Sequence, residues 1–396
     1  DARMRILQYF SRLRARDGGT PRAVLDLSHV LARRGHEVVL LTAGGDAVPA
    51  DRLQPESGLP TVVLLPSAFG AWARVSGRLD RTDAEKVREW IAWADAVHLH
   101  VPWDQVGVRI GRTARACGRR YLLTAHGMLD DETMGDRSLK NLKKRLFLMV
   151  SARRFLEEAE AVQCTSSVEA EQSIRWFPRG RTVVLPLLCD LSPYERQPEE
   201  RGHRAFEGAD PKVLFLGRLH PIKGLERLID AAPILRQRHP RVRVVLAGTG
   251  EPGYERSLRE RIAATGAADL VVPIGHVAGA DKLALLRAAD AVVLPSRHEN
   301  FGLSLIEALA SGTPVVATRG VNIWRELEAS GGAVIAPGTA EGIAEAIARV
   351  VSAPASREEM GKHGRAWAFA ELDAARVAAR YESLYEELRS PRPADA

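Results

Sequence analysis

Short apolar runs alternate with amphipathic helical patterns along the whole chain. In the first half, the apolar runs are MRILQYF, HEVVLLTA, PTVVLL, DAVHLHV, RYLLTAHG, EAVQCTS and TVVLPLL. In the second half, they are KVLFLGRL, RVRVVLAGTG, LVVPIGH, DAVVLPS, PVVAT and GAVIAP. Runs of this length with helices between them are typical of parallel strands buried on both faces. The pattern therefore predicts an α/β fold made of two doubly wound, Rossmann-like parallel-sheet domains.

A polar segment interrupts this rhythm between the two halves. Residues 193–211 are rich in charge, proline and glycine, which is typical of a linker. We therefore predict an N-terminal domain at 1–192, a second domain at 212–366 and a terminal segment at 367–396. A long helical region is expected at about 356–389, with a final helix at about Trp367 to Leu388. Because ligands of such sheets bind beyond the carboxyl ends of the strands, two facing domains would hold a site in a central cleft.

Composition narrows the possible partners and the compartment. The chain has 56 Lys and Arg against 50 Asp and Glu, for a net charge of +6. This balance suits an anionic ligand, an anionic membrane or nucleic acid, without choosing among them. Cys117, Cys164 and Cys189 lie far apart, which favours a reducing compartment over a disulfide framework or a zinc site. No apolar run approaches the length of a membrane helix, and MRILQYF reads as a strand rather than a signal peptide, so we expect a cytoplasmic protein.

The segment SRHENFGLSLIEALASGTPVVAT carries candidate chemistry. Its apolar residues recur at helical spacing, and Asn300 or Ser304 is the expected helix cap. A helix N-terminus binds anions, because its unpaired N–H groups and its dipole point outward there. Glu299 lies before this helix and Glu307 about one turn inside it, so both carboxylates are candidates for a site.

Two further loops follow predicted strands. Arg218 and Lys223 flank the loop GRLHPIKG, which joins a strand end to a helix. Two cations beside a helix N-terminus suit a pyrophosphate group. Gly18 and Gly19 follow the first strand, but the loop lacks the GxGxxG fingerprint, so on its own it reads as a simple strand–helix turn.

Histidines mark two strand ends in the first half. His126 follows YLLTA at the rim of the predicted site, which favours a functional role. His98 and His100 alternate on one strand and share one of its faces, so they are expected to be buried polar groups.

These motifs together give the chain a resemblance to a known family. The tandem halves, the Gly-Gly loop, HGML, GRL with KG, and two glutamates separated by seven residues resemble the retaining glycosyltransferases of family 4, the group 1 glycosyltransferases with the GT-B fold. The resemblance covers nearly the whole chain, and ENFGLSLIEALASGTPVVAT and GRLHPIKG are its most specific parts. HGMLD, KNLKKRLF and CTSSVEAEQSIR are also similar to bacterial members that build cell-surface polysaccharides.

The resemblance implies a site for a nucleotide diphosphate sugar, which serves as the donor substrate, and no cofactor. It implies that Glu299 lies near the donor sugar and that Glu307 holds the ribose hydroxyls. Arg218 and Lys223 would offset charge on the leaving diphosphate, and His126 would touch the sugar. The other donor-binding residues that it implies are Gly18, Gly19, Val277, Asn300, Phe301, Gly302 and Leu303.

The same resemblance implies a reaction and its partners. The enzyme would transfer a hexose, with anomeric retention, to a glycan or a lipid-linked acceptor in cell-surface polysaccharide synthesis. A front-face displacement aided by the leaving phosphate is the expected route. The N-terminal domain would face the acceptor, and the segment 367–396 would cross back onto that domain.

Departures from the family pattern refine these expectations. No DxD motif stands at a strand end, so we expect no metal ion. Some guanine-nucleotide users of this fold have a carboxylate where this chain has Gly279, which favours a uridine over a guanosine nucleotide. The segment LPLLCDL at 185–191 replaces a Pro-Asn-Gly-Val-Asp motif, which leaves specificity open there.

The basic stretch at 137–154 suggests a further contact. It holds seven cations and no acid, interleaved with leucine, phenylalanine and methionine. A solvated helix face is the simpler interpretation, but an amphipathic helix on an anionic membrane also fits. We therefore expect peripheral contact at the inner face of the membrane.

Other functions remain open from the sequence. A nucleotide-sugar epimerase of the same fold, or a non-catalytic sugar- or nucleotide-binding protein, would share much of this pattern. A phosphorylase is disfavoured because no lysine motif for a pyridoxal cofactor is recognised, and a dehydrogenase because the dinucleotide fingerprint is missing. No nucleic-acid-binding module is recognised, so no nucleic-acid partner is expected.

Overall fold

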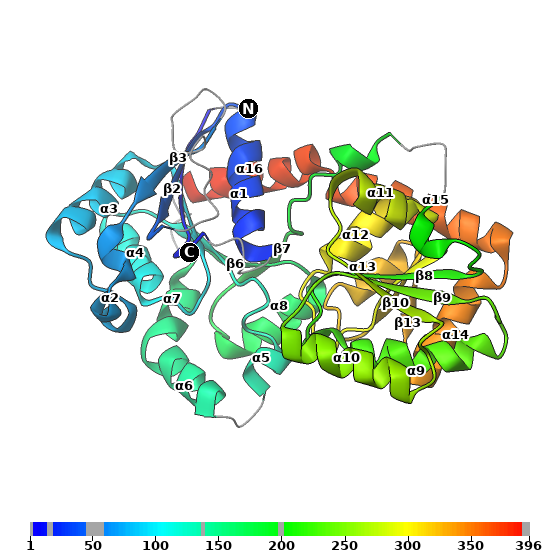
Figure 1. Cartoon of the computed structure of the whole chain (residues 1–396). Coiled ribbons are helices and arrows are strands. Elements are labelled where there is room, and N and C mark those ends of the chain that lie inside the picture. The colour runs from blue at the N-terminus through cyan, green and yellow to red at the C-terminus, as the bar shows by residue number, and fades with distance from the viewer. Residues whose placement is uncertain (1–2, 14–18, 45–58, 136–138, 197–201, 390–396) are drawn as a thin grey trace. The chain divides into compact units, whose positions relative to one another are not determined.

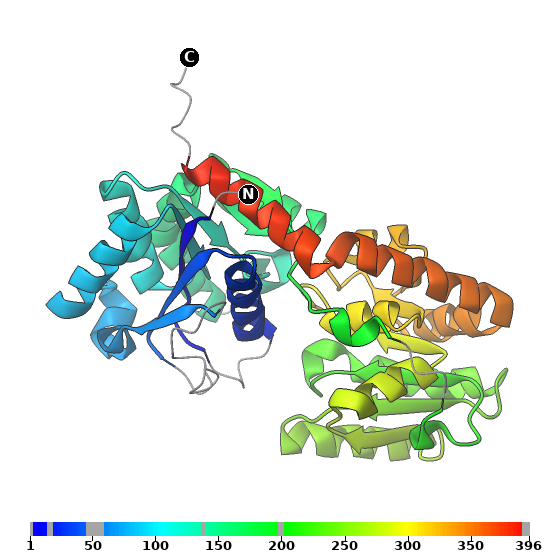
Figure 2. The same ribbon diagram turned by 90° about the horizontal axis from the view of Figure 1, so that it is seen from above.

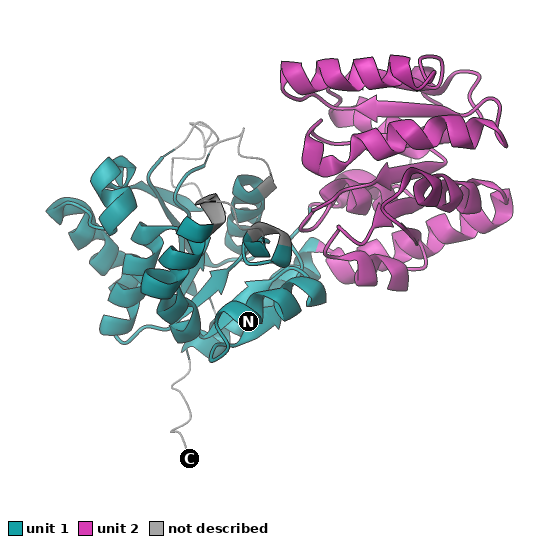
Figure 3. Ribbon diagram, turned by 90° about the horizontal axis from the view of Figure 1, so that it is seen from below, with its two compact units in different colours: residues 1–189, 374–396 teal, residues 190–373 magenta. Residues whose placement is uncertain are grey.

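The computed structural model describes residues 3–13, 19–44, 59–135, 139–196 and 202–389 (Figure 1). The chain divides into two compact units (Figure 3). Unit 1 comprises residues 1–189 and 374–396, and unit 2 comprises residues 190–373.

Unit 1 is built on a parallel sheet of seven strands in the order β3-β2-β1-β4-β5-β6-β7. The strands are β1 (Arg5–Tyr9), β2 (Glu37–Thr42), β3 (Thr61–Leu64), β4 (Ala96–His100), β5 (Tyr121–Thr124), β6 (Ala161–Cys164) and β7 (Thr182–Val184). The helices are α1 (Gly19–Arg33), α2 (Ala71–Ser76), α3 (Arg81–Trp93), α4 (Gln105–Ala116), α5 (Asp131–Gly135), α6 (Leu139–Phe147), α7 (Arg153–Glu158), α8 (Ser167–Ser173) and α16 (Ala374–Arg389).

Two apolar layers sandwich this sheet. Ile6 of β1 packs in the layer under α1 and α16, whereas its neighbour Leu7 packs in the layer under α3 and α4 (Figures 1 and 2). Successive residues of a strand point to opposite faces, so a strand covered on both sides must be apolar throughout. This is why these strands appear as continuous apolar runs in the sequence.

Unit 2 contains a parallel sheet of six strands in the order β10-β9-β8-β11-β12-β13. The strands are β8 (Lys212–Leu216), β9 (Arg243–Ala247), β10 (Val271–Gly275), β11 (Ala291–Leu294), β12 (Val315–Thr318) and β13 (Ala333–Ala336). The helices are α9 (Leu225–Arg236), α10 (Pro252–Ala264), α11 (Gly279–Ala288), α12 (Leu303–Ala310), α13 (Trp324–Ala329), α14 (Ala340–Val351) and α15 (Pro354–Leu372). A strand lies within each predicted apolar run, and the two doubly wound parallel sheets are confirmed.

Two details differ from the sequence expectations. The helical region expected at about 356–389 is present as two helices, α15 and α16, and the last helix begins after a break at Asp373 rather than near Trp367. The division between the units falls at Asp373 and at Cys189, whereas the sequence placed the boundaries at 366 and 192.

The described part of the predicted linker packs as part of unit 2. Tyr194 is 4% exposed and Phe206 is 2% exposed. The carbonyl oxygen of Tyr194 accepts a hydrogen bond of 2.8 Å from Arg365 on α15. Residues 197–201 of this stretch lie outside the described residues.

Candidate functional site

The central feature of unit 2 is the point where its strand order reverses. Strands β8 and β11 are neighbours there, and the connections from them run to opposite sides of the sheet. Ligands of doubly wound sheets bind at the carboxyl ends of such a strand pair. Lys223 lies in the turn after β8 and Glu299 in the loop after β11, and their side chains form an ion pair. Each side chain is only 18% exposed, so the pair is shielded from bulk water.

Close backbone packing fixes the loop that carries Lys223. Gly224 has a φ of 66°, and a Cβ atom there would lie 2.3 Å from the carbonyl oxygen of Pro295. Only glycine fits a left-handed conformation at this approach. The N–H of Arg297 also donates to the carbonyl oxygen of Ile222 at 2.8 Å. The turn after β8 is therefore bound directly to the end of β11.

The backbone of Glu299 is held on both sides by the loop after β12. Its N–H donates to the carbonyl oxygen of Gly320, and its own carbonyl oxygen accepts from the N–H of Asn322, both at 2.8 Å. The carboxylate thus projects from a fixed backbone position rather than from a free loop.

Helix α12 begins directly after this loop. Gly302, with a φ of 72°, is its N-cap, and as a glycine it makes no side-chain cap bond. The expectation that Asn300 or Ser304 caps the helix is therefore wrong, because a left-handed glycine makes the turn instead. Phe301 is buried and Leu303 is the first helical residue. This geometry leaves the amino end of α12 beside Glu299.

Glu307, one turn inside α12, has a partner that the sequence analysis did not assign to the site. Lys282 of α11 donates to its Oε1 at 2.8 Å, and each side chain is 21% exposed. The ammonium also lies 6.0 Å from the ring centroid of Tyr194. No sequence signal identifies this pairing, because it depends on how two helices lie side by side.

Two further predicted residues of unit 2 lie in loops that follow strands of the sheet. Arg218 is exposed in the loop after β8, and Val277 is half-buried between β10 and α11. His220 starts the turn that ends at Lys223, and its Nδ1 accepts from the N–H of Ile222 at 3.2 Å. Burial, followed by the charges of Arg218 and Lys223, lowers the pKa of His220. The loop after β8 is therefore a concentration of positive charge.

The predicted residues of unit 1 follow the carboxyl ends of strands in its own sheet. His126 follows β5 with a φ of 52°, an unusual conformation for a residue other than glycine. Its Nε2 lies 3.2 Å from Nδ1 of His100, whose Nε2 lies 3.2 Å from Oε1 of Gln8. Burial lowers the pKa of His126 to about 3, so the imidazole is neutral. Its contact with a donor sugar stays a prediction.

The glycine pair falls partly outside the structure. Gly19 is the first residue of α1, whereas Gly18 lies outside the described residues. In the described parts of both units, no group of three or more His, Cys, Asp or Glu side chains could hold a metal ion.

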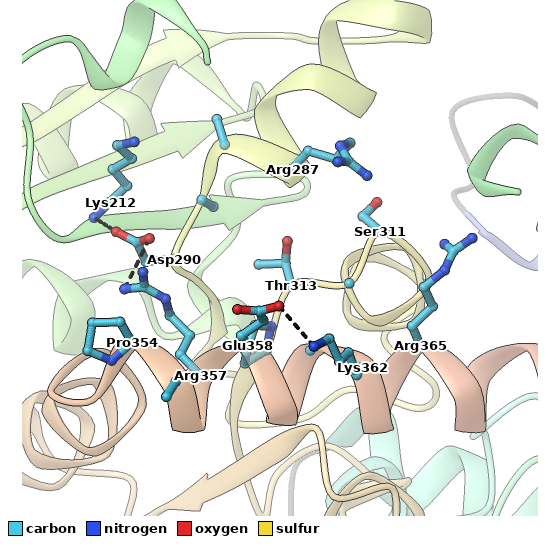
Figure 4. Close-up of a pocket in the computed structure, with 16 residues that line it drawn as sticks. Lys212, Arg287, Asp290, Ser311, Thr313, Pro354, Arg357, Glu358, Lys362 and Arg365 are labelled. Atoms are coloured by element: carbon cyan, nitrogen blue, oxygen red, sulfur yellow. Dashed lines mark hydrogen bonds and ion pairs between the residues drawn. The ribbon is translucent and has the colours of Figure 1, made fainter. Parts of the chain in front are cut away.

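A cavity of about 600 Å³ lies near the amino ends of strands β8, β11 and β12 in unit 2, at the opposite end of these strands from the candidate site (Figure 4). Its cations largely have protein partners. Arg357 pairs with Asp290 at 3.2 Å, Lys362 pairs with Glu358 at 2.9 Å, and Arg365 donates to the carbonyl oxygens of Tyr194 and Glu195. The contacts of Arg357 and Arg365 attach α15 to the rest of unit 2, whereas Lys362 and Glu358 both lie on α15.

Comparison with known proteins identifies the family of this chain. The model for glycosyl transferases group 1 matches residues 196–367, and the model for the glycosyl transferase 4-like domain matches residues 18–187. The chain is also 30% identical, over 366 residues, to the GDP-mannose-dependent alpha-(1-6)-phosphatidylinositol dimannoside mannosyltransferase of Mycobacterium tuberculosis. That alignment covers 89% of this chain and 88% of the relative. The chain belongs to the group 1 glycosyl transferases.

Solved structures agree with this assignment at the level of the fold. Sucrose-phosphate synthase from Thermosynechococcus elongatus superposes with a TM-score of 0.76 at 23% identity, over 98% of this chain and 99% of that chain. The Anabaena protein Alr3699/HepE, solved with UDP-glucose, gives a TM-score of 0.74 at 21% identity, over 97% and 100%. The GT-B fold is therefore confirmed for this group 1 glycosyl transferase. Alignments to some other relatives cover only about half of those proteins, 52% in one case.

Proposed function

We propose that this group 1 glycosyl transferase moves a hexose from a UDP-sugar to a glycan or a lipid-linked acceptor, with retention at the anomeric carbon. The observation that carries the proposal is the arrangement at the β8–β11 switch point. The Lys223–Glu299 pair lies there beside the amino end of α12, and Glu307 of the same helix pairs with Lys282 of α11. A nucleotide diphosphate sugar needs cations for its phosphates and carboxylates for its hydroxyls.

In the proposed reaction, the donor replaces part of the protein's own ion pairing. Lys223 and Arg218 contact the diphosphate, Glu307 accepts from the ribose hydroxyls, and Glu299 lies near the sugar. The acceptor oxygen bonds to the anomeric carbon as the bond from that carbon to the diphosphate oxygen breaks. The acceptor proton passes to the departing phosphate on the same face, which retains the configuration. Fixed cations offset the developing charge, so we propose that no metal is required.

The preference for uridine rests on one position. Gly279, the first residue of α11, offers no carboxylate to a guanine base. The Anabaena neighbour was solved with UDP-glucose, whereas the Mycobacterium relative is named for GDP-mannose. A direct comparison of UDP and GDP binding therefore decides which nucleotide base the donor carries.

The acceptor and the cellular setting follow from weaker support. The Mycobacterium relative is named for a phosphatidylinositol dimannoside acceptor, which is a lipid. The basic stretch at 137–154, of which Arg137 lies outside the described residues, would contact anionic lipid. No helix in the described parts of the chain is both long and apolar enough to span a membrane. We propose peripheral contact at the inner membrane face and a role in cell-surface polysaccharide synthesis.

A calorimetric titration without metal tests the donor site. We expect UDP to bind more tightly than GDP, and hydrolysis or transfer from a UDP-hexose to proceed in the presence of a chelator. Lys223→Met should lower turnover by at least about a hundredfold, as removal of one charge-stabilising donor commonly does. Lys212 is the first residue of β8, at the other end of that strand from the candidate site. Lys212→Met is therefore the matched control and should leave turnover unchanged. Binding of neither nucleotide would contradict the proposed function, and tighter binding of GDP would contradict the base assignment.

A further inference from the structure

Exposed apolar side chains gather on two segments of unit 1. In the described residues, nine large apolar side chains are exposed, and eight of them lie on these segments. The first segment runs from the end of β3 through the turn Pro66–Phe69 to α2, and presents Leu64, Phe69, Trp72 and Val75. The second, at α6 and the following π-helical turn Leu148–Ala152, presents Leu142, Leu146, Met149 and Val150. Trp72 is 67% exposed and Met149 is 76% exposed, so neither side chain is part of a core.

The two segments flank the same end of α4. A Cβ atom on Gly77, directly after α2, would lie 2.3 Å from the carbonyl oxygen of Gln105, the first residue of α4. The side-chain amide of Gln105 donates to Oγ of Ser151 in the π-helical turn at 3.3 Å. One residue therefore contacts both segments, which makes them neighbours on a single surface of unit 1 (Figure 1).

The two segments themselves carry cations and no acidic residue. Residues 59–79 and 139–156 contain no aspartate or glutamate. Arg74 and Lys143 are exposed among the apolar side chains. Arg153 and Arg154 follow the second segment at the start of α7, and each is paired with a glutamate one turn further along that helix.

We propose that these two segments form one docking surface for an anionic lipid bilayer. Apolar side chains that are interleaved with cations lie at the boundary between headgroups and acyl chains, and tryptophan favours that depth. Cations attract anionic headgroups, whereas the core of a protein interface tends to exclude charge. The proposal deepens the lipid-linked acceptor of the proposed function and adds α2, with Trp72, to the basic stretch at 137–154.

Vesicle co-sedimentation of the full chain tests this surface without any nucleotide. We expect binding to vesicles of phosphatidylcholine with phosphatidylglycerol, weak binding to phosphatidylcholine alone, and loss of binding at high salt. Trp72→Glu and Met149→Glu should each weaken the binding at least about tenfold, because each removes apolar area and adds a repelled charge. Val184→Glu changes the ninth exposed apolar residue, which lies on β7, and should bind as the unchanged protein does.

A second readout follows Trp72 directly. Lipids brominated on the acyl chain should quench part of the tryptophan fluorescence, and Trp72→Phe should remove that part while keeping vesicle affinity. If Trp72→Glu binds like the unchanged protein, α2 is not part of the surface and the proposal fails. It also fails if light scattering shows a dimer that Trp72→Glu converts to a monomer without change in vesicle binding. UDP titration of each variant reports on the donor site in unit 2 alone. Failure of the donor site can therefore be distinguished from failure of the docking surface.

Discussion

At the scale of single residues, each carboxylate of the candidate site is balanced by one lysine. Lys223 reaches Glu299 across the β8–β11 switch point, and Lys282 reaches Glu307 from the neighbouring helix. A carboxylate beside a diphosphate would repel it if its charge were not offset. Lys282 is therefore a positioning residue for Glu307, because it holds the carboxylate in place and neutralises it.

Removal of this lysine should weaken nucleotide binding. We expect Lys282→Met to raise the Kd for UDP about tenfold, the usual order for a lost hydrogen bond to a charged group. Lys282→Arg should restore most of the affinity, since it keeps the charge. Lys362→Met breaks an exposed lysine–glutamate pair on α15 and should leave the Kd unchanged. An unchanged Kd in Lys282→Met, measured by calorimetry, would show that Glu307 does not depend on this lysine.

The sequence predicted the residues that follow strands but not their partners. Glu299, Glu307 and Lys223 stand at fixed spacing from apolar runs, so their places beside a strand end or a helix start follow from local pattern. Lys282 does not, because its contact depends on the packing of α11 against α12. The helix cap was also missed, since Gly302 adopts a left-handed conformation that no spacing reveals.

At the scale of elements, the strands were predictable because both faces of each sheet are covered. Ile6 and Leu7 of β1 illustrate this, since each packs under a different pair of helices. The position of the break between α15 and α16 was not predictable, because no glycine or proline marks it in the sequence. It is set by tertiary structure, with α15 in unit 2 and α16 in unit 1.

Strand β4 carries a titratable group in the core of unit 1. His98 is fully buried, with Nδ1 at 2.8 Å from the Tyr385 hydroxyl and Nε2 at 2.7 Å from Oγ1 of Thr124. Burial, and then the proximity of His126, lowers the pKa of His98 to about 3. An unfolded histidine takes up a proton near pH 6.5, so acid favours the unfolded chain. The stability due to neutral His98 is complete above that pH and declines as the pH falls toward 3.

This effect gives a pH test of β4. Between pH 7.5 and pH 5, His98 alone should remove about 2 kcal/mol from the free energy of unfolding of unit 1. In His98→Gln, the loss over the same interval should be smaller by about that amount, whatever the stability at pH 7.5. Urea unfolding can be followed by tryptophan fluorescence, because five of the seven tryptophans lie in unit 1. An equal loss in both proteins would contradict the neutral state of His98.

At the scale of the whole molecule, the chain leaves unit 1 at Cys189 and returns to it at Ala374. Helix α16 is not an appendage, because Val377, Tyr381 and Tyr385 are part of a core cluster beneath the sheet. Glu382 of the same helix accepts hydrogen bonds from Arg34 at 2.6 and 2.8 Å and lies 2.8 Å from Nε2 of His36. Residues more than three hundred positions apart are thus joined in one unit, which a reading of local pattern does not disclose.

The last helix should therefore determine the stability of unit 1. The hydrogen bond from Arg34 lowers the pKa of Glu382, so its contribution is present above the ordinary carboxyl pKa and is lost as the pH falls through the lowered value. We expect Glu382→Gln to lower the free energy of unfolding of unit 1 by about 1–3 kcal/mol at pH 7. The difference should shrink in acid, because protonation makes the Glu382 carboxyl neutral, as the amide already is. Glu387 lies on the same helix as Glu382 and forms an exposed ion pair with Arg181. Glu387→Gln breaks that pair and should change the free energy of unfolding by less than about 1 kcal/mol. If urea unfolding gives the two variants the same stability at pH 7, the contact of Glu382 with Arg34 and His36 does not hold α16 in place.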